Sequence, residues 1–505
     1  MNEKQNLVVY WSRRDFRLLD NKALKVAVDA SRAQGIPLLP IFIIEDYMVQ
    51  ADPSSQFGYP SRYFLSRALP LFSAHFINFL ILQGKPSHIF SLLSKHFKLQ
   101  IHVNEDIYPD FYKQVKKIDN LSVTIYVHRD SLTIDRETKT GQGNYYSIFT
   151  PFKRAVWESF IGAQTEEKVC LRNQTSIPKN ILETIFTLVK IVPSDQQSLL
   201  LLFKESRTIN VLATTIDLNK YLPLPDLSTW YFDEERALSL FASYLESGNL
   251  AHYKENRDSL EKDTEFEVIA SNTLYGKTSR MSLALTWGLI SARTLKMMIV
   301  SYTNKDLRDL TSFSNDEGSV AFLTELIWRE FYKYLFYHNQ ELMQTEFQEK
   351  YRGTIEWVKG SVAHARFRAW LQGKTGYPVV DAAMSQLAAT GGMHNRSRMI
   401  VASILTKNLG VDWRAGQEYF RAALIDLDDA SNNGGWQWAA SVGADPKPIR
   451  IFNAELQAKN HDARGAYQKK WLGNRTYIDP IISHKQGREE ALRRYGLLGK
   501  APRDF

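Results

Sequence analysis

The pattern of apolar residues changes once along this chain, near residue 233, and this change constrains the fold more than any other feature. Before it, short apolar runs typical of buried strands alternate with amphipathic stretches of helical period. NLVVYW (6–11) and IPLLPIFII (36–44) predict strands, and the stretch between them predicts a helix that ends at Gly35. Such alternation predicts a doubly wound parallel α/β sheet, which binds ligands at the carboxyl ends of its strands.

The rest of the first region follows the same pattern. SRYFLSRALPLFSAHFINFLILQG (61–84) predicts one long helix, and HIFSLLSKHFKLQIHV (88–103) predicts a helix that leads into a third strand. A GxGxxG or phosphate-loop motif is absent from the sequence, which argues against an ordinary dinucleotide or nucleoside triphosphate site.

After Asp233, apolar residues recur three and four positions apart almost without interruption, which predicts an all-α domain. The intervening segment, about 165–227, is rich in Pro, Ser, Gln and Asn and predicts a connection with short structured pieces at most. We therefore divide the chain into an α/β domain (1–160), a linker (161–230) and a helical domain (231–505).

Composition excludes several classes of protein. The chain has one cysteine, Cys170, so it has no disulfide framework, four-cysteine zinc site or iron–sulfur cluster on its own thiolates. It begins without an apolar signal core, and its most apolar runs are too short to span a membrane, so we expect a soluble cytoplasmic protein.

Of the formal charge of +8, residues 445–505 carry +6, from 13 Lys/Arg against 7 Asp/Glu. This excess suits a polyanion, although a solvated basic tail is an equally common reading.

Three short motifs place chemically useful groups together. In ELIWREF (325–331), a carboxylate, an indole and a guanidinium share one helical face, as they also would in a half-buried helix with a local salt bridge. MHNRSRM (393–399) could cap a helix, or hydrogen-bond a flat heteroaromatic ring and its phosphates. LIDLDD (424–429) adds acidic groups directly before NNGGWQW, where two glycines precede two tryptophans.

In their order and residue identities, these motifs resemble the DNA photolyase/cryptochrome family, most closely the class I cyclobutane pyrimidine dimer photolyases. The likeness is carried by GKTGYPVVDAAMSQLAATGGMHNRSRM and its continuation to Ser441, by ELIWREFY, by WSRRDFRLLDNKAL (11–24) and by NYYSIFTPFKRAVW (144–157). It implies an antenna-binding α/β domain followed by a helical catalytic domain that holds FAD.

The resemblance also implies which residues contact FAD. Asn432 corresponds to the residue that faces flavin N5, and Gly434 and Gly435 would leave room where the backbone approaches the flavin ring. The implied cofactor contacts are Tyr253, Thr278, Ser279, Arg280, Met281, Ser282, Glu325, Arg329, Asn395, Arg398, Asp426, Asp428 and Asn432.

By the same resemblance, blue light excites reduced FAD, which gives an electron to a flipped-out pyrimidine dimer and splits it, without a metal or an amino-acid nucleophile. Glu325 would hydrogen-bond the base edge, and Trp436, Trp413 and Trp357 would form the electron chain, with Trp357 matched across a small gap. The implied contacts to DNA and lesion are Arg257, Glu325, Trp328, Asn395, Arg396, Met399 and Trp438. The expected partner is UV-damaged DNA, and we expect a monomer without an obligate protein partner.

Two other functions stay open at this point: a cryptochrome that signals without repair, and a photolyase for the six-four lesion. Asn395 after His394 disfavours the latter, because a second His usually stands there in those enzymes. The sequence departs from the family at Gly392, where a Trp is usual, and at Leu283 and Ala454, where Pro is usual. We interpret Gly392 as a sign of looser local packing. The antenna chromophore, in this family a folate, a deazaflavin, a flavin or none, is left open.

Overall fold

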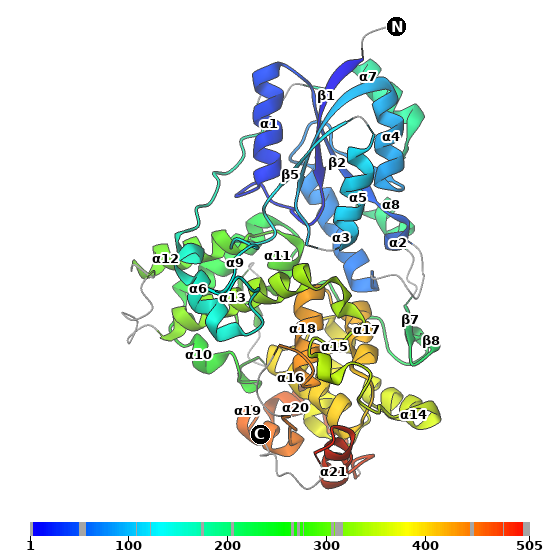
Figure 1. Ribbon diagram of the computed structural model, residues 1–505, viewed down its shortest axis with the longest axis vertical. Coiled ribbons are helices and arrows are strands. Elements are labelled where there is room, and N and C mark those ends of the chain that lie inside the picture. The colour runs from blue at the N-terminus through cyan, green and yellow to red at the C-terminus, as the bar shows by residue number, and fades with distance from the viewer. Residues whose placement is uncertain are drawn as a thin grey trace.

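The computed structural model describes residues 4–49, 57–107, 109–121, 123–172, 176–203, 207–263, 267–269, 273–275, 277–304, 308, 317–444, 449–477 and 479–497. An α/β domain forms one end of the elongated molecule and a helical domain the other (Figure 1).

The α/β domain is built on a six-stranded sheet with the order β5-β4-β1-β2-β3-β6. The five strands β1 (Gln5–Ser12), β2 (Leu38–Ile44), β3 (Leu80–Gln83), β4 (Phe97–Asn104) and β5 (Thr124–His128) run parallel. The predicted doubly wound sheet is therefore confirmed. The predicted helix before Gly35 is α1 (Lys22–Gln34), and Gly35 ends it in a left-handed conformation.

Helices cover both faces of this sheet, because its strands alternate buried side chains between two cores. Val8 and Tyr10 of β1 pack with α1 and with α3 (Tyr59–Ser73). Leu7, Val9 and Trp11 pack on the opposite face, with α4 (Pro86–His96), α5 (Pro109–Asp119) and α7 (Lys179–Leu188). The first of these cores continues into the helical domain.

One prediction for this domain is wrong in detail, and the linker has a role that we did not predict. The expected helix over 61–84 ends at Ser73, and Leu80–Gln83 form the parallel strand β3, because this short apolar run fits between β2 and β6. The linker also contributes to the sheet, since β6 (Lys190–Val192) pairs antiparallel with β3. Its other pieces are α7, α8 (Gln196–Leu202) and the hairpin β7 (Thr208–Val211)–β8 (Thr214–Asp217). The domain boundaries themselves remain our proposal.

Over its described residues, the second domain is helical, as predicted, apart from the short hairpin β9 (Glu267–Ile269)–β10 (Thr273–Tyr275). Its principal helices are α9 (Glu234–Glu246), α11 (Ser282–Trp287), α12 (Ala292–Thr303), α13 (Glu317–His338), α14 (Gly360–Leu371), α15 (Pro378–Thr390), α16 (Asn395–Ser403), α17 (Trp413–Ala423), α18 (Asp429–Ala439), α19 (Ala454–His461), α20 (Ala466–Leu472) and α21 (His484–Arg494). Helix α6 (Phe149–Gly162) packs on α13. Helix α18 contacts α13, α16 and α17, which brings its NNGGWQW segment to the centre of the bundle.

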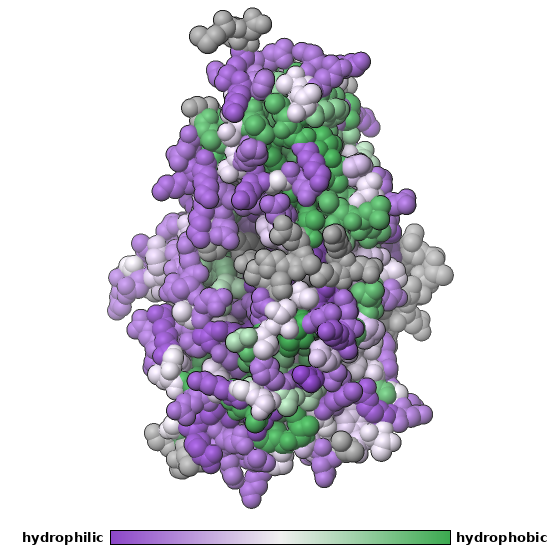
Figure 2. Space-filling model, turned by 90° about the vertical axis from the view of Figure 1, so that its right-hand side faces the viewer, coloured by the Kyte–Doolittle hydropathy of each residue, from purple (hydrophilic) through white to green (hydrophobic). Residues whose placement is uncertain are grey.

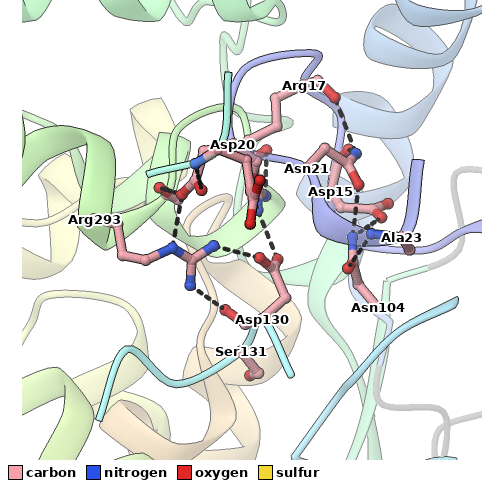
Figure 3. Close-up of polar contacts among 12 residues, drawn as sticks. Asp15, Arg17, Asp20, Asn21, Ala23, Asn104, Asp130, Ser131 and Arg293 are labelled. Carbon is pink, nitrogen blue, oxygen red and sulfur yellow. Dashed lines mark hydrogen bonds and ion pairs between the residues drawn. The ribbon is translucent and has the colours of Figure 1, made fainter. Parts of the chain in front are cut away.

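A buried network of charges joins the two domains (Figure 3). Arg293 of α12 donates to Asp20 at 2.8 Å and to Asp130 at 2.5 Å, and Arg17 donates to Asp130 at 2.6 Å. Burial by itself would raise the pKa of Asp130, but Arg17 and Arg293 outweigh it and hold this pKa well below its usual range. We call these four residues the interdomain network.

The strand order reverses between β1 and β4, where an α/β sheet usually binds its ligand. Here Asn104 at the end of β4 donates to Asp15 after β1 at 2.7 Å, and both residues lie beside the interdomain network (Figure 3). The remaining cavity at this point measures about 60 Å³. This volume is below the range of about 300–1,000 Å³ that is usual for ligand pockets.

The surface in Figure 2 is mostly hydrophilic, and its hydrophobic side chains gather mainly over the upper half, where the α/β domain lies. Among the described residues, no helix has both the length and the apolar character that a membrane crossing requires.

Candidate cofactor and lesion site

A cavity of about 690 Å³ lies in the helical domain, where α13, α16 and α18 meet. Its volume falls within the range of about 300–1,000 Å³ that is usual for ligand pockets. The cavity brings together most of the predicted site residues from both sets, those for the cofactor and those for the lesion. They are Arg257, Ser282, Glu325, Trp328, Arg329, Asn395, Arg396, Arg398, Met399, Asp426, Asp428, Asn432, Trp436 and Trp438.

The other predicted cofactor residues lie off the cavity wall. Tyr253 packs on Phe322 with ring centroids 4.9 Å apart. Thr278, Ser279 and Arg280 are half-buried in the segment before α11, and Met281 is buried at the start of that helix. Their roles remain predictions from the family resemblance.

The N-terminal half of α18 presents polar groups to the cavity. Asp428 caps the helix by accepting from the Ser431 backbone N–H at 2.8 Å. One turn later, Asn432 donates its amide N–H to the Gln417 carbonyl at 3.2 Å, which orients the side chain. Its Oδ1 is buried without a hydrogen-bond partner among the described residues. A buried amide oxygen left in this state at a cavity wall indicates that a ligand supplies the donor.

The two glycines of NNGGWQW have different roles. A Cβ at Gly434 would lie 2.1 Å from the Tyr332 ring, so this glycine lets α18 pack against α13. A Cβ at Gly435 would meet nothing within 4 Å, and Gly435 lines the cavity. The room that we expected from both glycines is thus supplied by Gly435.

Two ion pairs hold charged groups at the cavity: Arg398, Asp426 and Asp428 line it, whereas Lys333 approaches Asp428 from outside its wall. Nη2 of Arg398 lies within hydrogen-bond distance of both oxygens of Asp426, at 2.9 and 2.7 Å, and Nε donates to the Met393 carbonyl at 2.9 Å, so the guanidinium is held in place. Lys333 lies 4.0 Å from Asp428. Burial lowers the pKa of Lys333 to about 8, with a smaller contribution from Arg329. Burial alone would raise the pKa of Asp428, but Lys333 and Arg329 outweigh it and lower this pKa, so the carboxylate stays ionised.

Two tryptophans form aromatic walls, and each is backed by a residue that our sequence reasoning did not assign to the site. Trp328 stacks on Phe149 of α6, with ring centroids 3.5 Å apart and planes 7° from parallel. The Arg450 guanidinium lies over Trp438, 5.0 Å from the ring centroid. Phe149 lies within the family-like segment 144–157, which was the available signal. Arg450 carried none.

Four side chains on the cavity wall form two ion pairs that we call the rim pairs: Arg257 with Glu325, and Arg396 with Asp258 at 2.8 Å. Their side chains are 16–36% exposed. Arg257 and Asp258 are neighbours in the segment after α10 (Tyr253–Asn256), whereas their partners come from α13 and α16. Both arginines predicted to contact DNA are therefore paired within the chain, and Asp258 is a further residue that sequence reasoning missed.

The predicted electron chain begins at the cavity. Trp436 is buried there, and its indole fits over Gly416 of α17, where a Cβ would lie 2.1 Å away. It packs edge-on against Phe420 and Trp370, with centroids 5.0 and 6.0 Å away. Trp413 is buried at the start of α17, and Trp357 is half-buried, with its ring nearly perpendicular to that of Tyr495. The chain Trp436–Trp413–Trp357 remains a prediction.

The departures from the family are accommodated. A Cβ at Gly392 would lie 2.6 Å from the Trp230 ring, and Trp230 donates its indole N–H to the Thr390 carbonyl at 2.8 Å. A tryptophan from the linker thus fills this space, so the looser packing that we expected is wrong. Leu283 is fully buried, and Ala454 is buried at the first position of α19 after the Asn453 cap.

The wall of the cavity suits FAD. It combines the unpartnered Asn432 oxygen, the open face of Gly435 and the fixed charges of Arg398 and Asp426 with apolar contacts from α11 and α17. Few, fixed polar groups in a largely apolar cavity are typical of cofactor sites.

Comparisons with known proteins agree. The chain matches the family model described as DNA photolyase over residues 8–169, and the one described as FAD binding domain of DNA photolyase over residues 322–475. A deoxyribodipyrimidine photo-lyase of Synechococcus is 30% identical, covering 98% of this chain and 97% of its own. The crystal structure of a class III photolyase from Agrobacterium tumefaciens aligns with a TM-score of 0.72 and 27% identity over 99% of both chains. An archaeal photolyase from Sulfolobus tokodaii, solved with two FAD molecules, has the same fold, with a TM-score of 0.72 and 22% identity over 97% of this chain and 99% of its own.

Proposed function

The chain belongs to the DNA photolyase family, and on that premise we propose that it repairs cyclobutane pyrimidine dimers in DNA under blue light. It would thus act as a deoxyribodipyrimidine photo-lyase, a carbon–carbon lyase that carries FAD. One observation carries the proposal: a single cavity of about 690 Å³ is lined by both the residues matched to cofactor contacts and those matched to lesion contacts. Electron transfer to a lesion needs both partners in one space.

Bound FAD supplies light-driven transfer of one electron to the cyclobutane ring. The chain's own residues would hold and orient the two partners. Asn432 offers its free Oδ1 at the inner wall, and the Arg398–Asp426 pair holds a fixed charge beside it. These groups are set before any ligand enters, so little reorganisation is required when it binds.

The lesion side would accept two linked neighbouring bases of one strand that are turned out of the duplex. A damaged pair stacks poorly, so its extrusion costs less than that of normal bases. Trp328 and Trp438 offer flat apolar walls, and base–aromatic stacking contributes about 1–3 kcal/mol per base. Glu325 lines the cavity and would accept a hydrogen bond from the edge of a flipped base. In undamaged DNA these base edges stay inside the helix. The two tryptophan walls and the Glu325 carboxylate together favour binding of the lesion over binding of undamaged DNA.

The test is repair of an oligonucleotide with one thymine dimer by the purified, FAD-loaded and photoreduced protein, under blue light and in the dark. We expect light-dependent recovery of thymine absorbance at the dimer site. Trp328→Ala should weaken binding of the dimer oligonucleotide by about 1–3 kcal/mol, and the remote Asp29→Asn should leave repair unchanged. A six-four oligonucleotide is assayed in parallel. Repair of that lesion alone, or FAD bound without any repair, would overturn the proposal.

A further inference from the structure

The charges of the rim pairs have a consequence that the proposed function does not contain. Arg257, Glu325, Asp258 and Arg396 together carry no net charge, although two of them are matched to DNA contacts. Each arginine already faces a carboxylate with one edge of its guanidinium. A phosphate that binds this edge must displace the carboxylate. Because all four side chains are partly exposed, their ion pairs are weak enough to exchange.

The two carboxylates differ in what they gain when DNA arrives. Glu325 lies on α13 beside Trp328 and lines the cavity, so once released from Arg257 it can accept from a flipped base. Asp258 also lines the cavity but follows Arg257 directly in the segment after α10, and its side chain pairs with Arg396. After release it would leave a negative charge next to the incoming phosphate.

Resting on the proposed function, we propose that Asp258 competes with DNA phosphate for Arg396 and thereby sets the general affinity of the rim for DNA. In the free protein it neutralises Arg396, and in the DNA complex its freed carboxylate repels the phosphate. It therefore lowers affinity for any DNA, while Glu325 restores affinity only where a lesion is present. The penalty from Asp258 is common to damaged and undamaged DNA and cancels in their difference, so Glu325 supplies the preference for the lesion.

The test measures DNA affinity by fluorescence anisotropy at low and moderate salt, with damaged and undamaged oligonucleotides of one sequence. Asp258→Asn should bind both about two- to fivefold more tightly than the wild type, the range set by partly exposed charge pairs. Glu325→Gln should instead lose preference for the dimer. Asp29→Asn is the matched control, because it makes the same change in net charge on the exposed Lys25–Asp29 pair of α1.

A double-mutant cycle makes the test specific to this pair. In an Arg396→Gln background, Asp258→Asn should have no effect on affinity, and Asp258→Glu in the wild type should keep the wild-type value. Weaker binding by Asp258→Asn would overturn the inference, since Asp258 would then hold Arg396 in place for DNA. An effect equal to that of Asp29→Asn would overturn it as well. Failure of repair with the Asp258 effect intact would refute the proposed function and leave the competition standing.

Discussion

The interdomain network and the rim pairs contain the same residue types, yet they differ in burial and in number of partners. In the network, the Asp20, Asp130, Arg17 and Arg293 side chains are at most 8% exposed, and Arg293 contacts both aspartates. At the rim, each arginine has one carboxylate, and the side chains are 16–36% exposed. Buried charges must stay paired, because an unpaired charge away from water costs several kcal/mol, whereas partly exposed charges can exchange partners for water or phosphate.

Packing differs in the same way between filled and open regions. Around Gly392 and Gly434, neighbouring aromatic rings occupy all the space that a side chain would need, whereas Gly435 faces the open cavity. Ion pairing and packing therefore agree. The buried network and the tightly packed glycines hold the two domains and the helical bundle in one arrangement, and the cavity with its rim stays open to ligands.

The largest expected effect comes from breaking the network. Arg293→Ala leaves Asp20 without its ion-pair partner in a fully buried place, and we expect a loss of about 3–5 kcal/mol in the free energy of unfolding. Arg257→Ala at the rim should cost about 0–1 kcal/mol. Urea unfolding followed by circular dichroism measures both. Equal losses would contradict the distinction between the two sets of pairs.

The tight packing around Gly392 is tested by introducing the tryptophan that is usual in the family at this position. Gly392→Trp should destabilise the protein by about 1–3 kcal/mol, because overpacking forces neighbours to shift, and a Cβ there already lies 2.6 Å from Trp230. Removing that ring in the double variant Trp230→Ala/Gly392→Trp should recover most of the loss. Thermal melts of the two variants are compared with the wild type. A stable single variant would show that Trp230 does not fill the space.

The network also predicts a dependence on pH. The pKa of Asp130 is held well below its usual range, while the unfolded carboxyl titrates near its ordinary value of about 3.9. Between these values only the unfolded state takes up the proton, so stability falls as pH falls, by about 1.4 kcal/mol per pH unit for one proton. Urea unfolding from pH 5 to pH 2.5 should show a shallower slope in Asp130→Asn. Identical slopes in variant and wild type would refute the assignment.

The smallest effect is expected at the cavity wall. Gly435→Ala should stabilise α18 by about 0.5–1 kcal/mol, since a helix gains by exchange of Gly for Ala and the new Cβ meets nothing within 4 Å. The same methyl group narrows the cavity, so FAD should bind more weakly, as measured by titration of the apoprotein. Gly434→Ala is the control, and there we expect clear destabilisation through the clash with Tyr332. Stabilisation at Gly434 would contradict the reading of both glycines.

Local sequence was sufficient for much of the fold. The runs that form β1 and β2 are apolar and short, α1 ends at a glycine in the left-handed conformation, and helical period after Asp233 marks the second domain. Residues 61–84 misled us, because the helical period of α3 runs on into apolar residues that pair with β2 as β3. Helix and strand are equally compatible with a short apolar run, and only the neighbouring strand decides between them.

The sequence by itself determined the order of the two domains, the family and most of the residues that meet in one cavity, because periodicity and motif residues are carried by neighbours along the chain. Tertiary structure alone decided what those residues touch. In it, Phe149 of α6 stacks on Trp328, Trp230 of the linker fills the space at Gly392, and Arg396 pairs with Asp258. Such partners lie far apart in sequence, and their contact depends on how whole helices pack, which no local pattern records.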